Sequence, residues 1–219
     1  MGSTGRVLVV LGALSASLSL VDCAPAARPA ATGTRATVTT TARPSGNEGV
    51  IQSAPTATAT VTPPAEATVV PPRCDAAAPE SCNGLDDNCN GRIDEGCGYA
   101  SGGLQVTAAW QSDADINLVV VDPENNEVSE GHPSPSGGTL DQAANFNCVR
   151  SRPTVENAVW SAPTPPRGRY EVRLTAFDMC SAQSAPVTVS LSVGGRVVGT
   201  WRVEFTYPRQ EISFAVAVR

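Results

Sequence analysis

The feature that most constrains this chain is a polar stretch, residues 79–97, with too few apolar side chains to fold by burying them. It contains three cysteines, three aspartates, two glutamates, three asparagines and three glycines, and its large apolar residues are Leu85 and Ile93. A segment of this kind needs cross-links, a bound cation, or both. We therefore expect residues 74–98 to form a small module held by disulfides or a metal ion.

Residues 1–22 have the pattern of an export signal. Arg6 precedes an apolar run, residues 7–21, which is shorter than the about 20 residues that cross a bilayer and fits a secretory signal. Cys23 follows in a setting that resembles a bacterial lipobox, although Asp22 is unusual before such a cysteine. We expect a lipid on Cys23, with ordinary signal cleavage nearby as the alternative, and a location in the cell envelope or at the outer surface, lipid-anchored or secreted.

The seven cysteines fit an oxidising compartment. Without Cys23, six remain, which can pair completely, although the sequence does not fix their connectivity. The pairs that we predict are Cys82–Cys89, Cys74–Cys97 and Cys148–Cys180.

Composition argues against several functions. The net charge is −6 and the pI is about 4.8, whereas nucleic-acid binding needs a basic face. The chain has a single histidine, His132, and no nucleophile elbow, zinc-binding helix or paired carboxylates. We predict that the protein is not an enzyme.

Residues 24–73 are rich in alanine, threonine, proline and valine and contain no aromatic residue. Their prolines recur and no apolar face persists. This composition predicts a disordered linker.

Within the polar stretch, oxygen-bearing side chains alternate as in the opening of a calcium-binding loop, and Gly91 permits the sharp bend. Cys97 stands where a full EF-hand needs glutamate, so we expect a shortened loop. Oxygen ligands favour calcium, with a transition metal, or disulfides alone with solvated acids, as the alternatives. The predicted ligands are Asp86, Asn88, Asn90, Arg92 through its carbonyl oxygen, Asp94 and Glu95.

Residues 80–95 also resemble, nearly position for position, the metal-binding motif of MopE-type repeats in secreted bacterial proteins, and the resemblance covers about residues 74–97. The name-giving member of that family is associated with copper. The resemblance therefore implies metal binding and adds copper to the candidate metals.

From residue 102 to 219 apolar residues recur at every second position, for example Val187, Val189, Leu191 and Val193, and the pair Gly194-Gly195 is a hairpin signal. At least six half-buried strands without an amphipathic helix predict an all-β fold, an antiparallel β-sandwich. The expected aromatic core residues are Trp110, Trp160, Trp201 and Phe214.

Four segments in this region resemble YfaP-type domains in the same order: residues 110–123, 136–141, 156–160 and 166–170. The similarity covers about residues 103–219 and implies an exported β-sandwich of unassigned biochemical role. The chain departs from that pattern at Asn117 and Val119.

The candidate residues for a second cation site are Asp113, Asp115 and Asp141, together with Glu156. The alternative is that these acidic residues only stabilise turns through hydrogen bonds to their own backbone. Residues 123–155 read as one long polar loop, which is our candidate binding surface.

These features predict an exported, lipid-anchored surface protein that binds an extracellular protein or glycan, contacts the membrane only through its lipid, and binds no nucleic acid. The alternatives to this function are capture of copper at the cell surface and an accessory role beside an extracellular hydrolase.

Overall fold

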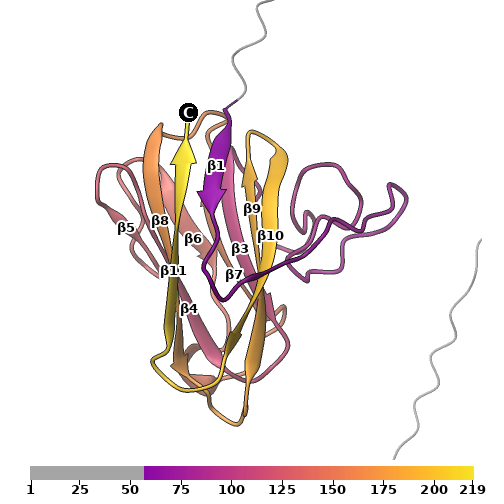
Figure 1. Cartoon of the computed structure of the whole chain (residues 1–219), viewed down its shortest axis with the longest axis vertical. Helices are drawn as coiled ribbons and strands as arrows, with labels where there is room; N and C mark the ends of the chain where they lie inside the picture. Colours follow the sequence, from indigo (N-terminus) through magenta and orange to yellow (C-terminus); the bar gives the residue numbers. More distant parts are fainter. Residues whose placement is uncertain (1–56) are drawn as a thin grey trace, which may run out of the picture. The chain divides into compact units, whose positions relative to one another are not determined.

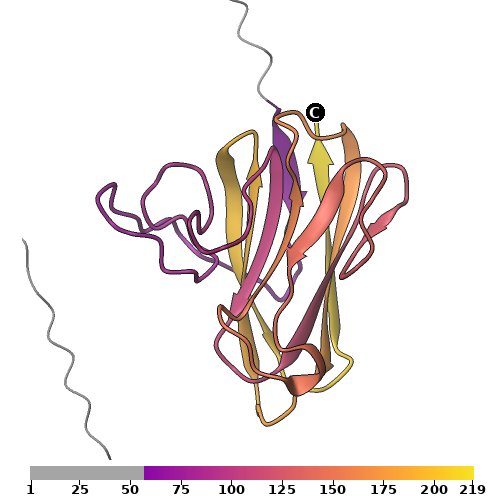
Figure 2. The same cartoon turned by 180° about the vertical axis from the view of Figure 1, so that it is seen from behind.

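The fold consists of two antiparallel sheets. The computed structural model describes residues 57–219, and their eleven strands face each other in a sandwich (Figures 1 and 2). The predicted all-β antiparallel sandwich is confirmed. The predicted signal, Cys23 and most of the predicted linker lie outside the described residues. No helix in the described part of the chain is long and apolar enough to span a bilayer.

The five-stranded sheet has, in spatial order, β1 (Ala59–Thr62), β11 (Glu211–Val218), β8 (Gly168–Asp178), β4 (Asp115–Val121) and β5 (Glu127–Val128). The six-stranded sheet has β2 (Thr68–Val69), β10 (Arg196–Phe205), β9 (Ala185–Val193), β3 (Leu104–Trp110), β7 (Val155–Trp160) and β6 (Gly138–Gln142). One 3₁₀ turn, η1 (Phe146–Cys148), completes the elements of residues 57–219.

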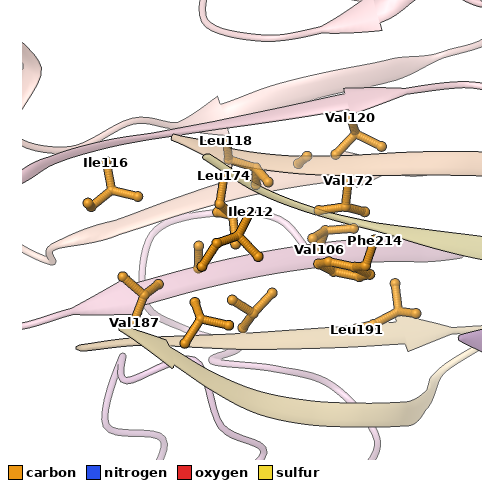
Figure 3. Close-up of a cluster of buried hydrophobic side chains, with 14 of the residues drawn as sticks. Val106, Ile116, Leu118, Val120, Val172, Leu174, Val187, Leu191, Ile212 and Phe214 are labelled. Carbon is orange, nitrogen blue, oxygen red and sulfur yellow. The ribbon is translucent and has the colours of Figure 1, made fainter. Parts of the chain in front are cut away.

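The core lies between the sheets and is built from the alternate apolar positions of both. Figure 3 shows this packing, with Leu118 and Val172 of the five-stranded sheet opposite Val106 and Leu191 of the six-stranded sheet. The predicted aromatic core is confirmed, since all three tryptophans and Phe214 are buried. Trp201 lies with its ring centroid 5.7 Å from that of Phe214.

Three central strands differ from the prediction of half-buried strands. Every residue of β3 and β7 is buried, and in β9 only Pro186 is exposed. The outer face of these strands carries polar side chains, which periodicity alone assigns to solvent. They are buried because residues 81–99 cover them, as described below.

The predicted linker is wrong at its C-terminal end. β1 pairs with β11 from Ala59↔Val218 to Thr62↔Ala215, and β2 pairs with β10. The prolines that argued against a strand, Pro63 and Pro64, fall in the connection between β1 and β2. They therefore interrupt neither ladder, and the two strands cover edges that would otherwise be unpaired.

The predicted long loop, residues 123–155, is also not one loop. It contains β5, β6 and η1, and β6 pairs with β7 at the edge of the six-stranded sheet. The hairpin expected at Gly194-Gly195 is present, joining β9 to β10, and both glycines have positive φ.

Candidate functional site

The cysteine module, residues 74–98, lies on the outer face of the six-stranded sheet rather than beside the sandwich. Its loops project next to β9 and β10 in Figure 1. The Ser192 hydroxyl donates to the carbonyl of Gly91 at 3.0 Å, Ser190 donates to the carbonyl of Gly84, and Gln105 Nε2 donates to that of Ile93 at 3.1 Å. The polar positions of β3 and β9 thus satisfy backbone carbonyls of the module.

Gly91 explains how closely the module approaches the sheet. A Cβ atom at this position would lie 2.1 Å from the carbonyl oxygen of Gly195, and the residue has φ +85°. Both the space and the backbone conformation therefore require glycine here. Ile93, one of the two large apolar residues of the stretch, is completely buried in the same contact.

The disulfides of the module are Cys74–Cys89 and Cys82–Cys97, so our predicted pairs Cys82–Cys89 and Cys74–Cys97 are wrong. The reason is the fold of the loop: Asp75 N–H donates to the carbonyl of Asp87, which holds Cys74 beside Cys89. The predicted third pair, Cys148–Cys180, is confirmed, with 5.7 Å between its Cα atoms.

Asp94 places Cys82 beside Cys97. Its carboxylate accepts the N–H groups of Asn83 at 2.9 Å and Gly84 at 2.7 Å, and the hydroxyl of Tyr99 at 2.6 Å. Burial raises the pKa of Asp94 even though these donors favour its charged form. Asp94, a predicted metal ligand, is therefore a structural anchor between residues 83–84 and Tyr99.

Glu80 is a second anchor, which the sequence analysis did not single out although it opens the MopE-like motif. Its carboxylate accepts the N–H groups of Asn88 and Asp94, each at 3.2 Å, and of Asp87 at 3.4 Å. Burial raises the pKa of Glu80, the nearby Glu95 adds to this, and the three N–H donors oppose it. A carboxylate with three backbone donors organises the loop from inside.

The remaining predicted ligands share one coiled loop. Asp86 accepts the N–H groups of Asn90 and Gly91 at 3.0 and 2.8 Å. The side-chain amides of Asn88 and Asn90 both donate to Glu95 Oε1. Burial disfavours the charged form of Glu95, but these amides and Arg92 outweigh it, so its pKa is lowered.

This loop fits a calcium ion in its donor chemistry. The second carboxylate oxygen of Glu95, Oε2, is buried and has no hydrogen-bond partner among the described residues. Carboxylate, amide and carbonyl oxygens are the ligands that calcium takes. The candidate set is therefore Asp86, Asn88, Asn90, the carbonyl of Arg92, and Glu95, without Asp94.

The acidic side chains of this loop do not by themselves form a cluster close enough to hold a metal ion. Within residues 57–219, one set of three acidic, cysteine or histidine side chains has ligand atoms within 4.8 Å of one another: Cys148, Asp178 and Cys180, two of which form a disulfide. Since all six cysteines from Cys74 to Cys180 are paired, none offers a thiolate. Any metal in the loop would thus be held by oxygen atoms.

The structure does not bring Asp113, Asp115 and Asp141 together as a second cation site. Asp113 pairs with Arg150 and Ser181, Asp115 accepts the N–H of Asn147, and Asp141 accepts those of Ala100 and the Asn157 amide. Each aspartate therefore stabilises a different loop or strand end.

One end of the sandwich carries exposed apolar side chains. We call this the loop end: residues 143–154, 177–184 and 206–210, at the end of the sandwich away from the C-terminus in Figure 1. Among the described residues, four of the five exposed large hydrophobic side chains lie there. They are Phe146, Val149, Phe177 and Tyr207, with exposed fractions of 59%, 71%, 36% and 58%.

The loop end is held in a defined conformation. Cys148–Cys180 joins two of its three segments, and the Arg209 N–H donates to the carbonyl of Ala176, which ties in the third. The Arg209 guanidinium also lies 3.7 Å over the ring of Phe177. The disulfide and these contacts thus join the three segments that carry the apolar side chains.

No family model, curated protein or solved structure matches this chain. The resemblances to MopE-type and YfaP-type sequences therefore remain predictions from the motifs.

Proposed function

We propose that the chain is an exported, lipid-tethered surface protein, without catalytic activity, that binds a partner protein through its loop end. The observation that carries this proposal is that Phe146, Val149, Phe177 and Tyr207 are all exposed at one end of the sandwich, where Cys148–Cys180 joins two of the three segments that carry them. Contiguous exposed apolar side chains mark interaction surfaces, and aromatic anchors with arginine at the rim are typical of protein interfaces.

The order of the chain supports the tethered arrangement. β1 begins at the same end of the sandwich as the C-terminus, since Ala59 pairs with Val218. The loop end lies at the opposite end (Figure 2). A chain that enters from its N-terminal side therefore presents the loop end away from its tether.

The test is binding of the labelled, disulfide-intact chain to the surface of the cells that produce it. We expect saturable binding, and we expect Phe146→Ser combined with Tyr207→Ser to weaken it by about tenfold or more, because buried aromatic anchors contribute about 2 kcal/mol or more each at interfaces. Val69→Ser is the matched control, since Val69 is 65% exposed but lies in β2. Equal binding by the double variant and the parent would refute the proposal.

We also propose that the loop of residues 86–95 binds calcium and that the ion stiffens the cysteine module. A hundredfold excess of calcium over Kd should raise the free energy of unfolding by about 2.7 kcal/mol. Asp86→Ala and Glu95→Gln should remove this gain, whereas Asp94→Asn should destabilise the chain equally with and without calcium. Glu124→Ala, an exposed acidic residue outside the module, is the control, and identical unfolding of the parent in calcium and in chelator would contradict the proposal.

Surface copper capture and an accessory role beside a hydrolase stay predictions from the sequence.

A further inference from the structure

A cleft lies on the outer face of the six-stranded sheet, beside the edge of the cysteine module that residues 81–85 form. Its volume is about 770 Å³. One wall is residues 81–85 of the module and another is residues 152–154, while Ala109, Thr188 and Arg202 line it from three neighbouring strands, β3, β9 and β10. We call it the arginine cleft, because Arg152 and Arg202 are the charged residues that line it.

The charge of this cleft is opposite to that of the whole protein. The chain carries 21 acidic and 15 basic residues, yet no carboxylate lines the cleft. Arg152 and Arg202 are exposed, and neither belongs to the two ion pairs found in residues 57–219, Arg150–Asp113 and Arg173–Glu127. Two exposed guanidinium groups without an ion-pair partner favour an anion, although the Asp87 carboxylate accepts hydrogen bonds from the lining residues Ser81 and Asn83 at 3.1 and 3.2 Å.

Neutral hydrogen-bonding groups surround the two arginines. The side chains of Ser81, Gln111 and Thr188 line the cleft and make no hydrogen bond to another described residue. Asn83 and Thr154 also line the cleft, but the Asn83 amide bonds Asp87 and the N–H of Leu85, and the Thr154 hydroxyl donates to the carbonyl of Ser151. Groups of this kind pair with ligand hydroxyls, and Trp110 is too deeply buried to stack on a nucleic-acid base.

The two arginines lie on opposite sides of the cleft. Arg202 lies on β10, directly opposite Thr188 on β9, and Thr188 lies opposite Ala109 on β3. Ala109 in turn lies opposite Val155, the first residue of β7 and the third after Arg152. Three strand spacings of about 4.8 Å separate the Cα rows of β10 and β7 by about 14 Å, and the cleft of about 770 Å³ has room for a ligand larger than a single small ion.

We propose that the arginine cleft binds an acidic oligosaccharide. Arg152 and Arg202 pair with its carboxylate or sulfate groups, for which the planar guanidinium offers two parallel hydrogen bonds. The hydroxyl and amide side chains between them bind the sugar hydroxyls. This site goes beyond the proposed function, because it contains none of the four exposed apolar side chains of the loop end, although residues 152–154 belong to both regions.

The experiment is calorimetric titration of the disulfide-intact chain with three oligosaccharides of equal length: oligogalacturonate, which carries carboxylates, a heparin fragment, which carries sulfates, and a neutral maltooligosaccharide. We expect at least one acidic probe to bind and the neutral one not to bind, and the stronger acidic probe then identifies the preferred anion. Arg152→Gln and Arg202→Gln should each weaken binding by about tenfold or more, since a hydrogen bond to a charged group contributes about 1.5–3 kcal/mol.

Arg169→Gln is the matched control, because Arg169 is an exposed arginine on β8 in the other sheet. All three variants should keep the parent's disulfides, as measured by intact mass, and the parent's melting temperature. The proposal is overturned if no acidic probe binds, if Arg152→Gln and Arg202→Gln bind like the parent, or if Arg169→Gln or a polyglutamate probe reproduces the effect through charge alone. If the parent protein binds cells but binds none of the acidic oligosaccharides, the arginine cleft proposal is overturned and the proposed function stands.

Discussion

Glu156 is an ionisable group inside the sandwich. It shares the inner face of β7 with Ala158 and Trp160, and its carboxyl group accepts the N–H of Leu118 from β4 in the opposite sheet. β5 pairs with β4 only at Val120 and Val121, so the N–H of Leu118 has no strand partner on that side. Burial raises the pKa of Glu156 well above its usual range, more than the Leu118 N–H lowers it.

This shift predicts a stability that depends on pH. In the unfolded chain Glu156 loses its proton near pH 4.5, while in the folded chain it keeps it to a higher pH. The folded state therefore binds more protons in this window, and the free energy of unfolding falls as pH rises from about 4.5 through the folded pKa. Glu156→Gln keeps an acceptor for Leu118 and should not show this fall.

Urea unfolding of both proteins from pH 4 to 8 measures the difference. Burial also raises the pKa of Asp94 and of Asp115; both groups are present in both proteins, and the charge of Asp115 is itself one cause of the raised pKa of Glu156. Glu156→Leu, which leaves the Leu118 N–H unpaired, should be less stable at every pH by about 1–3 kcal/mol. Parallel pH curves for the parent and Glu156→Gln would contradict the assignment.

At the scale of elements, the cysteine module is a pair of interleaved loops. In the sequence, Cys82 lies between Cys74 and Cys89, and Cys89 lies between Cys82 and Cys97. Each disulfide therefore joins a residue inside the loop that the other closes to a residue outside that loop. Each bridge spans 15 positions, a length for which chain entropy predicts about 3 kcal/mol.

Cys74→Ser combined with Cys89→Ser tests this connectivity. The double variant should show no free thiol among residues 57–219 after denaturation, keep Cys82–Cys97 and Cys148–Cys180, and lose about 3 kcal/mol of stability. Cys82→Ser combined with Cys97→Ser should behave in the same way. Free thiols in the first double variant, or a Cys82–Cys89 peptide in the parent, would show that the other pairing is correct.

On the scale of the whole molecule, module and sandwich share one buried polar layer. Gln105 Nε2 bonds the carbonyl of Ile93, the Thr107 hydroxyl and Asn157 Oδ1, and Asn157 in turn donates to the carbonyl of Ala100. Residues 57–219 accordingly form one compact unit. Unfolding of the module alone would break these joining hydrogen bonds and expose the buried Ile93 side chain to water, so neither part is expected to unfold alone.

We therefore expect a single cooperative thermal transition for the oxidised protein. Calorimetric and van't Hoff enthalpies should agree, and tryptophan fluorescence, which reports the sandwich, should change at the same temperature as hydrogen exchange at Gly84 and Gly91. Glu171→Gln, an exposed change on β8, is a control that should leave the transition single. An early transition confined to the module would show that it folds separately.

The sequence by itself determined what depends on neighbours along the chain. Alternation of apolar residues identified the strands of the sandwich, Gly194-Gly195 located a hairpin, and the tryptophans were identified as core. The polar stretch also showed that it needs cross-links, because a segment with two large apolar residues cannot supply a core of its own.

Only the tertiary structure decided which distant segments meet. The pairing of the cysteines depends on where Asp94 and Asp75 fold the loop, and the strand identity of Ala59–Thr62 depends on the free edge of β11. The polar outer face of β3 and β9 has the period of a solvent-facing surface, and it is buried only because the module lies on it. The periodicity of apolar residues distinguishes the two faces of a single strand. Burial, disulfide pairing and the arginine cleft depend instead on contacts between segments far apart in the sequence.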